Sequence, residues 1–171
     1  EVAHIRRERM DPSRVSPDTE LIYWSIPGLD EVNGPQITRA SEIGSHKFCV
    51  QNDAILYSLL NPRIPRFALA DGGTNVVCST EFAVLEPTQE IDIDYLGVFV
   101  SSSQFQYLIG ALANGTTKSR ERVKASDLES IQFLLPPLEE QKRIVDVVSS
   151  IDAYIDALQQ QSDRAREARD A

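Results

Sequence analysis

Two short segments of the chain carry side chains suited to binding a phosphate group or the edge of a base. In the first, Asn61-Pro62-Arg63-Ile64-Pro65-Arg66, two arginines stand in a proline-bounded loop between apolar stretches. A guanidinium group offers a rigid fork of donors that matches phosphate oxygens and the edge of guanine. We take Asn61, Arg63 and Arg66 as candidate DNA contacts, although two solvated surface arginines would give the same pattern.

The second segment, residues 115–124, places small hydroxyl residues among cations after the predicted end of a helix at Gly115. Hydroxyl groups and backbone amides can bind phosphate, and the cations add favourable charge. The candidate DNA contacts in this segment are Thr116, Thr117, Lys118, Arg120 and Arg122. A solvated loop would explain the composition equally well.

The side-chain arrangements that enzymes need are missing from this sequence. It has two histidines, His4 and His46, and none of the motifs GxSxG, HExxH, GxGxxG, the phosphate-binding loop or the Asn-Pro-Pro-aromatic signature of adenine methyltransferases. Asp92 and Asp94 could hold a metal, but they open a predicted helix, where acidic residues suit the positive end of the helix dipole. We therefore expect a protein that is not an enzyme, with no catalytic residue, metal or cofactor.

The net charge of −9 argues against a protein that coats DNA by charge alone, because such proteins usually carry net positive charge. The basic residues gather in short clusters, at residues 6–14, 63–66 and 118–124. A locally basic groove on an acidic body therefore remains open, and it would depend on specific contacts.

The two cysteines, Cys49 and Cys78, have no CxxC partner and no histidine cluster beside them. We expect two buried thiols in a reducing cytoplasm rather than a zinc site. No run of about 20 apolar residues and no apolar signal region is present, which predicts a cytoplasmic protein with no membrane partner. The chain begins at Glu1, which suggests that it was cut from a longer protein.

The elements that must position the candidate contacts change in character along the chain. Residues 1–20 are charged and polar and read as an extended lead-in or loop. Short apolar runs ended by turn residues recur from residue 21 to 87 and predict β-strands. Residues 94–113 have the spacing of one or two amphipathic helices, with a break or N-cap at residues 101–103. Residues 131–135 read as a final strand, so the whole predicts an α+β fold.

The C-terminal segment predicts one long helix, since residues 138–168 contain neither glycine nor proline. Ile144, Val148, Ile151, Ile155 and Leu158 follow one another at spacings of 4, 3, 4 and 3, which is a heptad seam. At about 1.5 Å per residue such a helix would be about 45 Å long, too long to pack wholly on its own domain. We expect these five residues to pair with another helix; a helix folded back on its own domain is the alternative.

The stretch from Leu134 to Val145, LLPPLEEQKRIV, resembles the segment that joins a target-recognition domain to the conserved helix in specificity subunits of type I restriction-modification systems. Three further motifs are similar to that family and occur in its order. They are Asp53–Ser58 with the loop through Arg66, Cys78–Phe82, and Gly115–Arg120. Together the four motifs cover roughly residues 50–158.

The resemblance implies a β-rich target-recognition domain over residues 1–137 and a conserved spacer and dimerisation helix of the coiled-coil type over residues 138–171. It also implies a division of labour. The recognition domain reads a few base pairs of a split double-stranded DNA target, and antiparallel pairing of the long helices fixes the gap between half-sites. Adenine methyltransferase (modification) subunits and a restriction subunit supply the chemistry.

The sequence departs from the family pattern in two respects. Many members carry a basic residue where this chain has Leu59, so one phosphate contact would be missing. A full specificity subunit usually has two recognition domains and two conserved helices, whereas this chain has one of each. It would therefore be a half-subunit that pairs with itself through its C-terminal helix, or a fragment.

Two other functions are compatible with parts of the sequence. Related recognition domains occur in single-chain enzymes that fuse methyltransferase and nuclease, and a catalytic motif upstream would favour that origin. An acidic DNA mimic or a coiled-coil protein that binds a restriction enzyme would suit the charge of −9. The clustered cations and the β-rich pattern do not fit such a mimic.

Overall fold

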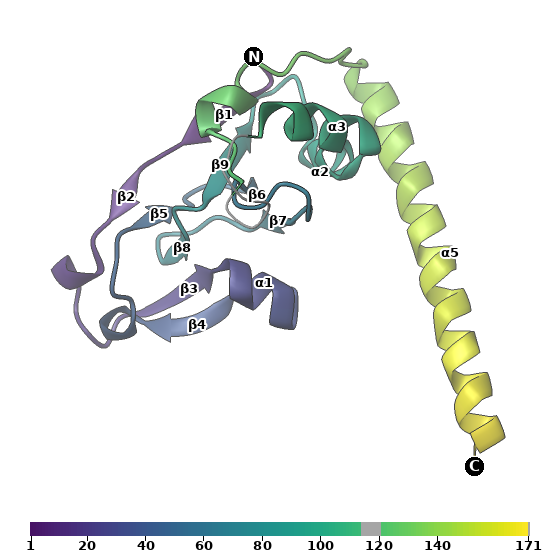
Figure 1. Ribbon diagram of the computed structural model, residues 1–171, viewed down its shortest axis with the longest axis horizontal. Helices are drawn as coiled ribbons and strands as arrows, with labels where there is room; N and C mark the ends of the chain where they lie inside the picture. Colours follow the sequence, from purple (N-terminus) through teal and green to yellow (C-terminus); the bar gives the residue numbers. More distant parts are fainter. Residues whose placement is uncertain (114–120, 171) are drawn as a thin grey trace.

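Two β-sheets form the body of the protein, and one long helix extends away from it (Figure 1). The computed structural model describes residues 1–113 and 121–170. Most helical residues belong to a pair of helices on the body and to the long helix at the C-terminal end. The predicted fold class, a β-rich α+β body followed by a protruding helix, is confirmed.

The first sheet has four strands in the order β1-β9-β6-β7, all paired antiparallel. They are β1 (Ala3–Arg6), β6 (Ala54–Ser58), β7 (Phe67–Ala70) and β9 (Phe82–Pro87). Residues 1–20 were predicted to be an extended lead-in or loop; they include β1, which pairs along β9 with Ile5 opposite Leu85. Only every second side chain of this edge strand turns toward the core. The polar residues between them made the apolar alternation of a strand difficult to recognise in the sequence.

The second sheet has five strands in the order β2-β5-β8-β3-β4. They are β2 (Arg9–Met10), β3 (Glu20–Trp24), β4 (Gln36–Arg39), β5 (Lys47–Cys49) and β8 (Val76–Cys78). β3 and β8 run parallel, whereas the β2–β5, β5–β8 and β3–β4 pairs are antiparallel. Helix α1 (Ile26–Val32) follows β3, and two short 3-10 helices, η1 (Pro12–Arg14) and η2 (Ala40–Glu42), complete this half.

Strand β6 lies at the centre of the body and is buried on both faces. Ile55 and Tyr57 belong to an apolar cluster with the helices, while Ala54 and Leu56 belong to a second cluster that includes residues of both sheets. A strand with two covered faces needs apolar side chains at every position, which explains the unbroken run AILY in the sequence.

A pair of helices, α2 (Ile93–Ser101) and α3 (Ser103–Leu112), covers the outer face of the first sheet. Asp92 is the N-cap of α2, and its carboxylate accepts hydrogen bonds from the N–H groups of Asp94 and Tyr95. Ser102 separates the helices, so the predicted break at residues 101–103 is confirmed. Asp92 and Asp94 thus serve the start of a helix.

The segment from Ile131 to Leu135 was predicted to be a strand, and this prediction was wrong. It is extended but pairs with no strand among the described residues. Its alternate apolar side chains pack against the cluster of the helices, and the ring of Phe133 stacks on Phe99 with centroids 3.9 Å apart. The alternation of apolar and polar residues in this segment therefore arises because the apolar cluster covers one side of it, although no neighbouring strand pairs with it.

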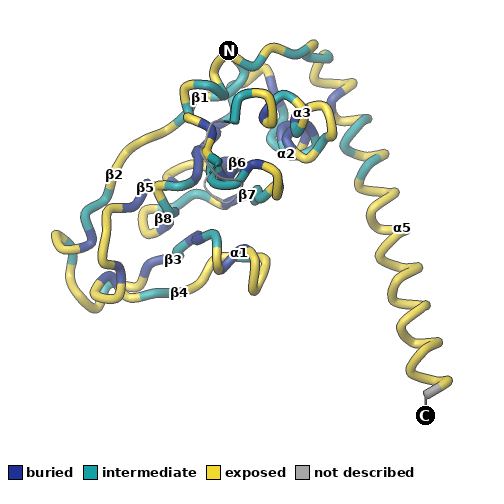
Figure 2. Tube along the Cα trace, in the orientation of Figure 1, coloured by how far each residue is buried: buried dark blue, intermediate teal, exposed yellow. Residues whose placement is uncertain are grey.

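Helix α5 (Leu138–Asp170) touches the body only near its start (Figure 2). Ile144 and Val145 pack against the apolar cluster of α2 and α3, whereas every side chain described from Ser149 onward is exposed. Among the described residues, no helix combines the length and the apolar character that crossing a bilayer would require.

Candidate nucleic-acid interface and exposed helix seam

The two candidate DNA segments, distant in sequence, meet at one edge of the body. The N–H of Asn61 donates to the backbone oxygen of Glu121 at 2.9 Å, and the N–H of Val123 donates to that of Leu59 at 3.0 Å. Leu60 and Arg122 form an isolated antiparallel bridge between the two segments. The loop at residues 61–66 and the segment at residues 121–124 thus form one surface, here called the paired loops.

Asn61 starts the first loop in the left-handed backbone region, with a φ of 51°. Asparagine tolerates this conformation better than most residues. The N–H of Ile64 closes the turn on the backbone oxygen of Asn61 at 3.0 Å. The role of Asn61 visible here is therefore to shape the loop that presents Arg63.

Arg63 is exposed and makes a two-point ion pair with Glu121. Its Nε donates to Oε2 at 2.6 Å and its Nη2 to Oε1 at 2.7 Å. These hydrogen bonds and the negative charge of Glu121 raise the pKa of Arg63. The guanidinium has five N–H donors, so the pair leaves capacity for a further acceptor.

Arg66 has a different environment, because its side chain is only 17% exposed. Its Nε donates to Oδ1 of Asp30 in α1 at 2.6 Å, and this hydrogen bond lowers the pKa of Asp30. The Arg66 side chain therefore links the first loop to α1. A DNA contact by Arg66 remains a prediction.

The second segment contributes Arg122, which is exposed and lies 3.1 Å from a carboxylate oxygen of Glu81. Lys124 is exposed as well, and its backbone N–H donates to Asp127 at the start of α4 (Ala125–Leu128). The remaining predicted contacts, Thr116, Thr117, Lys118 and Arg120, lie outside the described residues. Lys124 was part of the basic cluster in the sequence but was not singled out as a contact.

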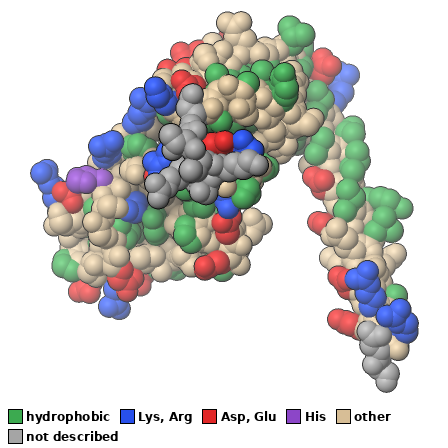
Figure 3. Space-filling view, in the orientation of Figure 1, with side chains coloured by type: hydrophobic (Ala, Val, Ile, Leu, Met, Phe, Trp, Pro, Cys, Tyr) green, Lys and Arg blue, Asp and Glu red, His purple; other side chains and the backbone are tan. Residues whose placement is uncertain are grey.

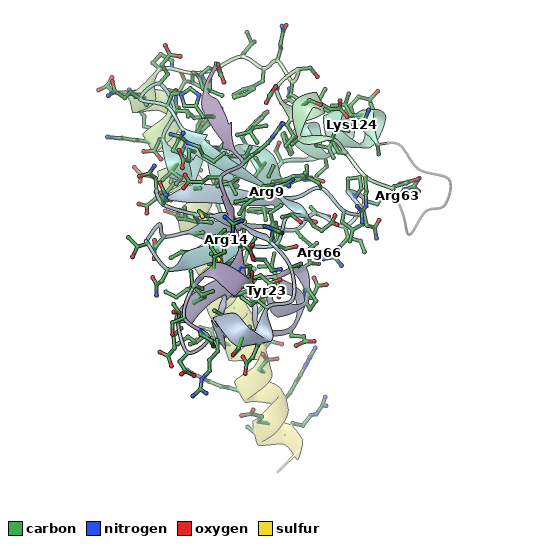
Figure 4. All side chains as sticks on the ribbon, turned by 90° about the vertical axis from the view of Figure 1, so that its left-hand side faces the viewer. Arg9, Arg14, Tyr23, Arg63, Arg66 and Lys124 are labelled. Atoms are coloured by element: carbon green, nitrogen blue, oxygen red, sulfur yellow. The ribbon has the colours of Figure 1, made fainter. Side chains whose placement is uncertain are left out.

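A second group of cations includes Arg9 on β2 and Arg14 in η1, both labelled in Figure 4. Arg9 stands over the ring of Phe48, 5.8 Å from its centroid, and Arg14 is 84% exposed with Asp11 3.4 Å away. The sequence showed this basic cluster at residues 6–14 but did not predict that Arg9 would lie on a strand of the second sheet.

Lys47 on β5 is buried, and burial lowers its pKa. Its ammonium donates to the backbone oxygen of Ser45 at 3.0 Å and to its hydroxyl at 2.7 Å, and it stands 5.3 Å from the ring centroid of Tyr23. Trp24 is buried in the apolar cluster that includes residues of both sheets. Lys47 is thus held by local groups and is not a surface contact.

Carboxylates lie next to most of these cations. Figure 3 shows acidic side chains among the basic ones on the body, and ion pairs join Arg6 to Glu86 and Arg7 to Glu129. Acidic partners therefore neutralise part of the positive charge of these described cations. Binding to a polyanion would require these cations to exchange or share their acidic partners.

Both cysteine thiols are free. Cys78 is buried, and burial raises its pKa to about 12, while Cys49 is half-buried with a raised pKa from the same cause. Their pairing strands place Cys49 opposite Val77 and Cys78 opposite Phe48. The thiols serve as small apolar groups within the second sheet.

The predicted seam of α5 divides into a base and an exposed part. Ile144 packs on the body, and Val148 is half-buried. Ile151, Ile155 and Leu158 are exposed by 53%, 44% and 46%. Val147 and Tyr154, which the heptad reading omitted, are also exposed and widen the stripe that Figure 3 shows along the helix.

Comparison with proteins of known sequence identifies a family. Residues 1–165 match the family model described as the type I restriction modification DNA specificity domain. The specificity subunit of type I restriction enzyme HindI from Haemophilus influenzae is 25% identical over 115 residues, which cover 66% of this chain and 25% of that protein.

Solved structures with the same fold are longer. The HsdS subunit from Thermoanaerobacter tengcongensis has a TM-score of 0.79 and 23% identity over 97% of this chain and 44% of its own. A chain from a type I R-M system, studied for complex assembly and conformational transition, has a TM-score of 0.78 and 22% identity. The match covers 97% of this chain and 44% of that chain. The S subunit of a type I restriction-modification system from M. genitalium has a TM-score of 0.55 and 17% identity. The match covers 93% of this chain and 39% of that subunit. The chain thus spans less than half the length of these relatives.

Proposed function

This chain belongs to the family of type I restriction-modification DNA specificity domains, and we propose that it recognises one half of a split double-stranded DNA target. In this role it directs adenine methyltransferase subunits and a restriction subunit to that target. The observation that carries the proposal is the meeting of the two basic segments at one edge of the body, with hydrogen bonds between Asn61 and Glu121 and between Leu59 and Val123.

The paired loops suit DNA because they present arginine on a rigid support. Backbone hydrogen bonds between the loops fix their spacing. The guanidinium of Arg63 is exposed at one side of the body, where Figure 4 labels it. Such a group binds phosphate oxygens for position or the edge of guanine for sequence. Thr116, Thr117, Lys118, Arg120 and Arg122 are proposed to add contacts from the second segment.

Helix α5 supplies the second half of the proposed role. Its exposed apolar stripe, Ile151, Ile155 and Leu158 with Val147 and Tyr154, has the spacing of a coiled-coil seam. We assign this stripe to pairing with a second copy of the chain, which would hold two recognition bodies at a set distance. Residues 1–137 would then form the recognition domain and residues 138–171 the spacer helix.

Catalysis belongs to the partner subunits in this proposal. The chain itself would contribute no catalytic residue, metal or cofactor. Among the described residues, no group of three or more histidine, cysteine, aspartate or glutamate side chains is arranged to hold a metal.

The test is to purify the chain with a type I adenine methyltransferase subunit and map the adenines that the complex methylates. A stoichiometric complex that methylates one split motif supports the proposal, and the motif should be lost when Arg63, Lys118, Arg120 and Arg122 are replaced by alanine together. A matched control replaces Arg164 and Arg166 at the far end of α5 and should leave the motif unchanged. A complex without any methylated motif would contradict the role in recognition.

A further inference from the structure

The side chain of Gln141, in the first turn of α5, is completely buried. Its Oε1 atom accepts a hydrogen bond from the backbone N–H of Asp92 at 2.8 Å. Its Nε2 atom donates to the backbone oxygens of Glu90 at 3.0 Å and of Pro136 at 2.8 Å. Both donors and the acceptor of this amide are therefore used on backbone groups of two other segments.

Two of these hydrogen bonds join α5 to the start of α2, and the third joins it to the segment that enters α5. Asp92 is the N-cap of α2, and Glu90 lies in the turn just before it. Pro136 belongs to the extended segment that leads into α5, and the backbone N–H of Gln141 donates to Pro137 at 3.0 Å. One side chain thus links the first turn of α5, the segment that enters it and the start of α2.

The link matters because α5 has little other support. Ile144 and Val145 pack against the cluster that contains Tyr95 and Leu96, and side chains described from Ser149 onward are exposed. Apolar contacts have no preferred direction, whereas hydrogen bonds depend on angle. The direction in which α5 leaves the body is therefore set at its base, with Gln141 as the directional element.

A small change in the angle of α5 at its base produces a large displacement at its far end. At about 1.5 Å per residue, the part of α5 beyond Gln141 is about 45 Å long. A tilt of about 5° at the base would move its end by about 4 Å, close to the rise of about 3.4 Å for one base pair. The angle of α5 therefore has to be held within a few degrees if the helix is to measure DNA.

We propose that Gln141 is a positioning residue that fixes the angle between the recognition body and α5, and through it the number of base pairs between two half-sites. This inference rests on the proposed function, in which two paired helices separate two recognition bodies. The hydrogen bonds of the Gln141 side chain go to residues 90, 92 and 136, none of which belongs to the paired loops, so the sequence of each half-site is expected not to depend on it.

The first experiment uses the assembled methyltransferase complex and a DNA library in which the spacer between the two half-sites varies in length. Gln141→Met keeps the side-chain length and removes the three hydrogen bonds. We expect the half-site sequences to stay unchanged. Methylation at spacers one base pair longer or shorter should rise at least about threefold relative to methylation at the preferred spacer. A ratio of this size corresponds to a free energy no larger than that of one hydrogen bond. Gln160→Met, on the face of α5 opposite the seam, is the control.

A uniform loss of methylation with an unchanged spacer preference would overturn the proposal, since a merely structural role gives that result. Gln141→Glu is the second variant and covers the case in which Gln141→Met does not fold. When ionised, it keeps the acceptor for Asp92 but has no donor for Glu90 and Pro136, so the same change in spacer preference is expected. A wild-type complex that methylates no split motif would contradict the proposed function itself, and the next measurement separates that outcome.

The second measurement needs no DNA. Spin labels at Tyr107→Cys on α3 and Ala157→Cys on α5, in a Cys49→Ser background, report the distance between body and helix within one chain. Labelled chains are diluted with unlabelled ones, so that distances between copies do not contribute. We expect a broader or shifted distance distribution for Gln141→Met than for Gln160→Met. Identical distributions would overturn the proposal whatever the DNA experiment gives.

Discussion

Arg63 and Glu121 face each other across the paired loops, with Nε–Oε2 and Nη2–Oε1 distances of 2.6 and 2.7 Å. A carboxylate bound in this two-point manner presents its oxygens much as a phosphate does. Glu121 therefore occupies donors of Arg63 that DNA would use in the proposed role. DNA bound at this edge must displace the carboxylate or add to it, and both routes make binding depend on geometry as well as charge.

Replacing Glu121 with glutamine should strengthen binding to DNA of any sequence. The change removes the charge that competes for Arg63, and the salt dependence of binding should steepen by about one phosphate contact. Fluorescence anisotropy of target and scrambled duplexes over a salt series measures both effects on the assembled complex. Glu167→Gln, which changes the net charge equally at the far end of α5, is the control. Weaker binding by Glu121→Gln would show that the carboxylate helps rather than competes.

Replacing Arg66 with alanine should affect stability more than DNA binding. Its side chain is largely covered and holds Asp30, whereas Arg63 is exposed. We expect a lower urea midpoint for Arg66→Ala than for Arg63→Ala, and a greater loss of DNA affinity for Arg63→Ala. Equal urea midpoints for the two variants would show that Arg66 does not support the fold.

The contribution of Arg66 should also depend on pH. Its hydrogen bond holds the pKa of Asp30 below the ordinary value of 3.8, so the ion pair stabilises the folded state above that pH. The stability is lost as pH falls through the lowered pKa. The difference in urea midpoint between wild type and Arg66→Ala should therefore shrink below about pH 4. A difference that grows toward acid would contradict this assignment.

Replacing Ile155 with aspartate should break the pairing of α5 without unfolding the body. Burial of an isoleucine side chain contributes about 1.5–3 kcal/mol, and a self-pair contains two copies. We expect the dissociation constant, measured by sedimentation equilibrium, to rise at least about 100-fold. Gln160→Asp places the same residue on the opposite face and should have little effect. A wild-type chain that stays monomeric would contradict self-pairing.

Replacing Ser102 with alanine should destabilise the body by about 1 kcal/mol, because a helix loses its N-cap. The hydroxyl accepts from the N–H of Phe105 at 3.2 Å and donates to the backbone oxygen of Phe99 at 2.7 Å. Urea unfolding measures the change, with the exposed neighbour Ser103→Ala as the control. A loss no greater than that of the control would mean that the two helices meet without this cap.

Local signals account for the elements that the sequence predicted well. The break at Ser102 and the start of α2 at Asp92 depend on side chains that bond to the nearest backbone groups. The long helix depends on an uninterrupted run of helix-forming residues. Each of these interactions lies within a few residues along the chain, so the sequence contains them directly.

Strands were harder to predict because a strand needs a partner. Residues 131–135 alternate like a strand but find an apolar cluster instead of a sheet edge, and β1 lacks a clear pattern yet pairs with β9. The candidate site had the same difficulty. Its two segments could be named separately, but their meeting through Asn61 and Glu121 depends on the whole fold, as do the acidic partners of Arg63 and Arg66.

In the proposed self-pairing, the exposure of α5 beyond Ser149 would make its helical state depend on protein concentration. In proteins, most of the stability of an amphipathic helix comes from tertiary packing of its apolar face, which the outer part of α5 lacks in the single chain. In a dilute chain the outer part of α5 would therefore exchange between helix and coil, and association would shift it to helix by burying the apolar stripe. Folding of this segment and assembly would then be a single equilibrium, so circular dichroism of the free chain would report its self-association.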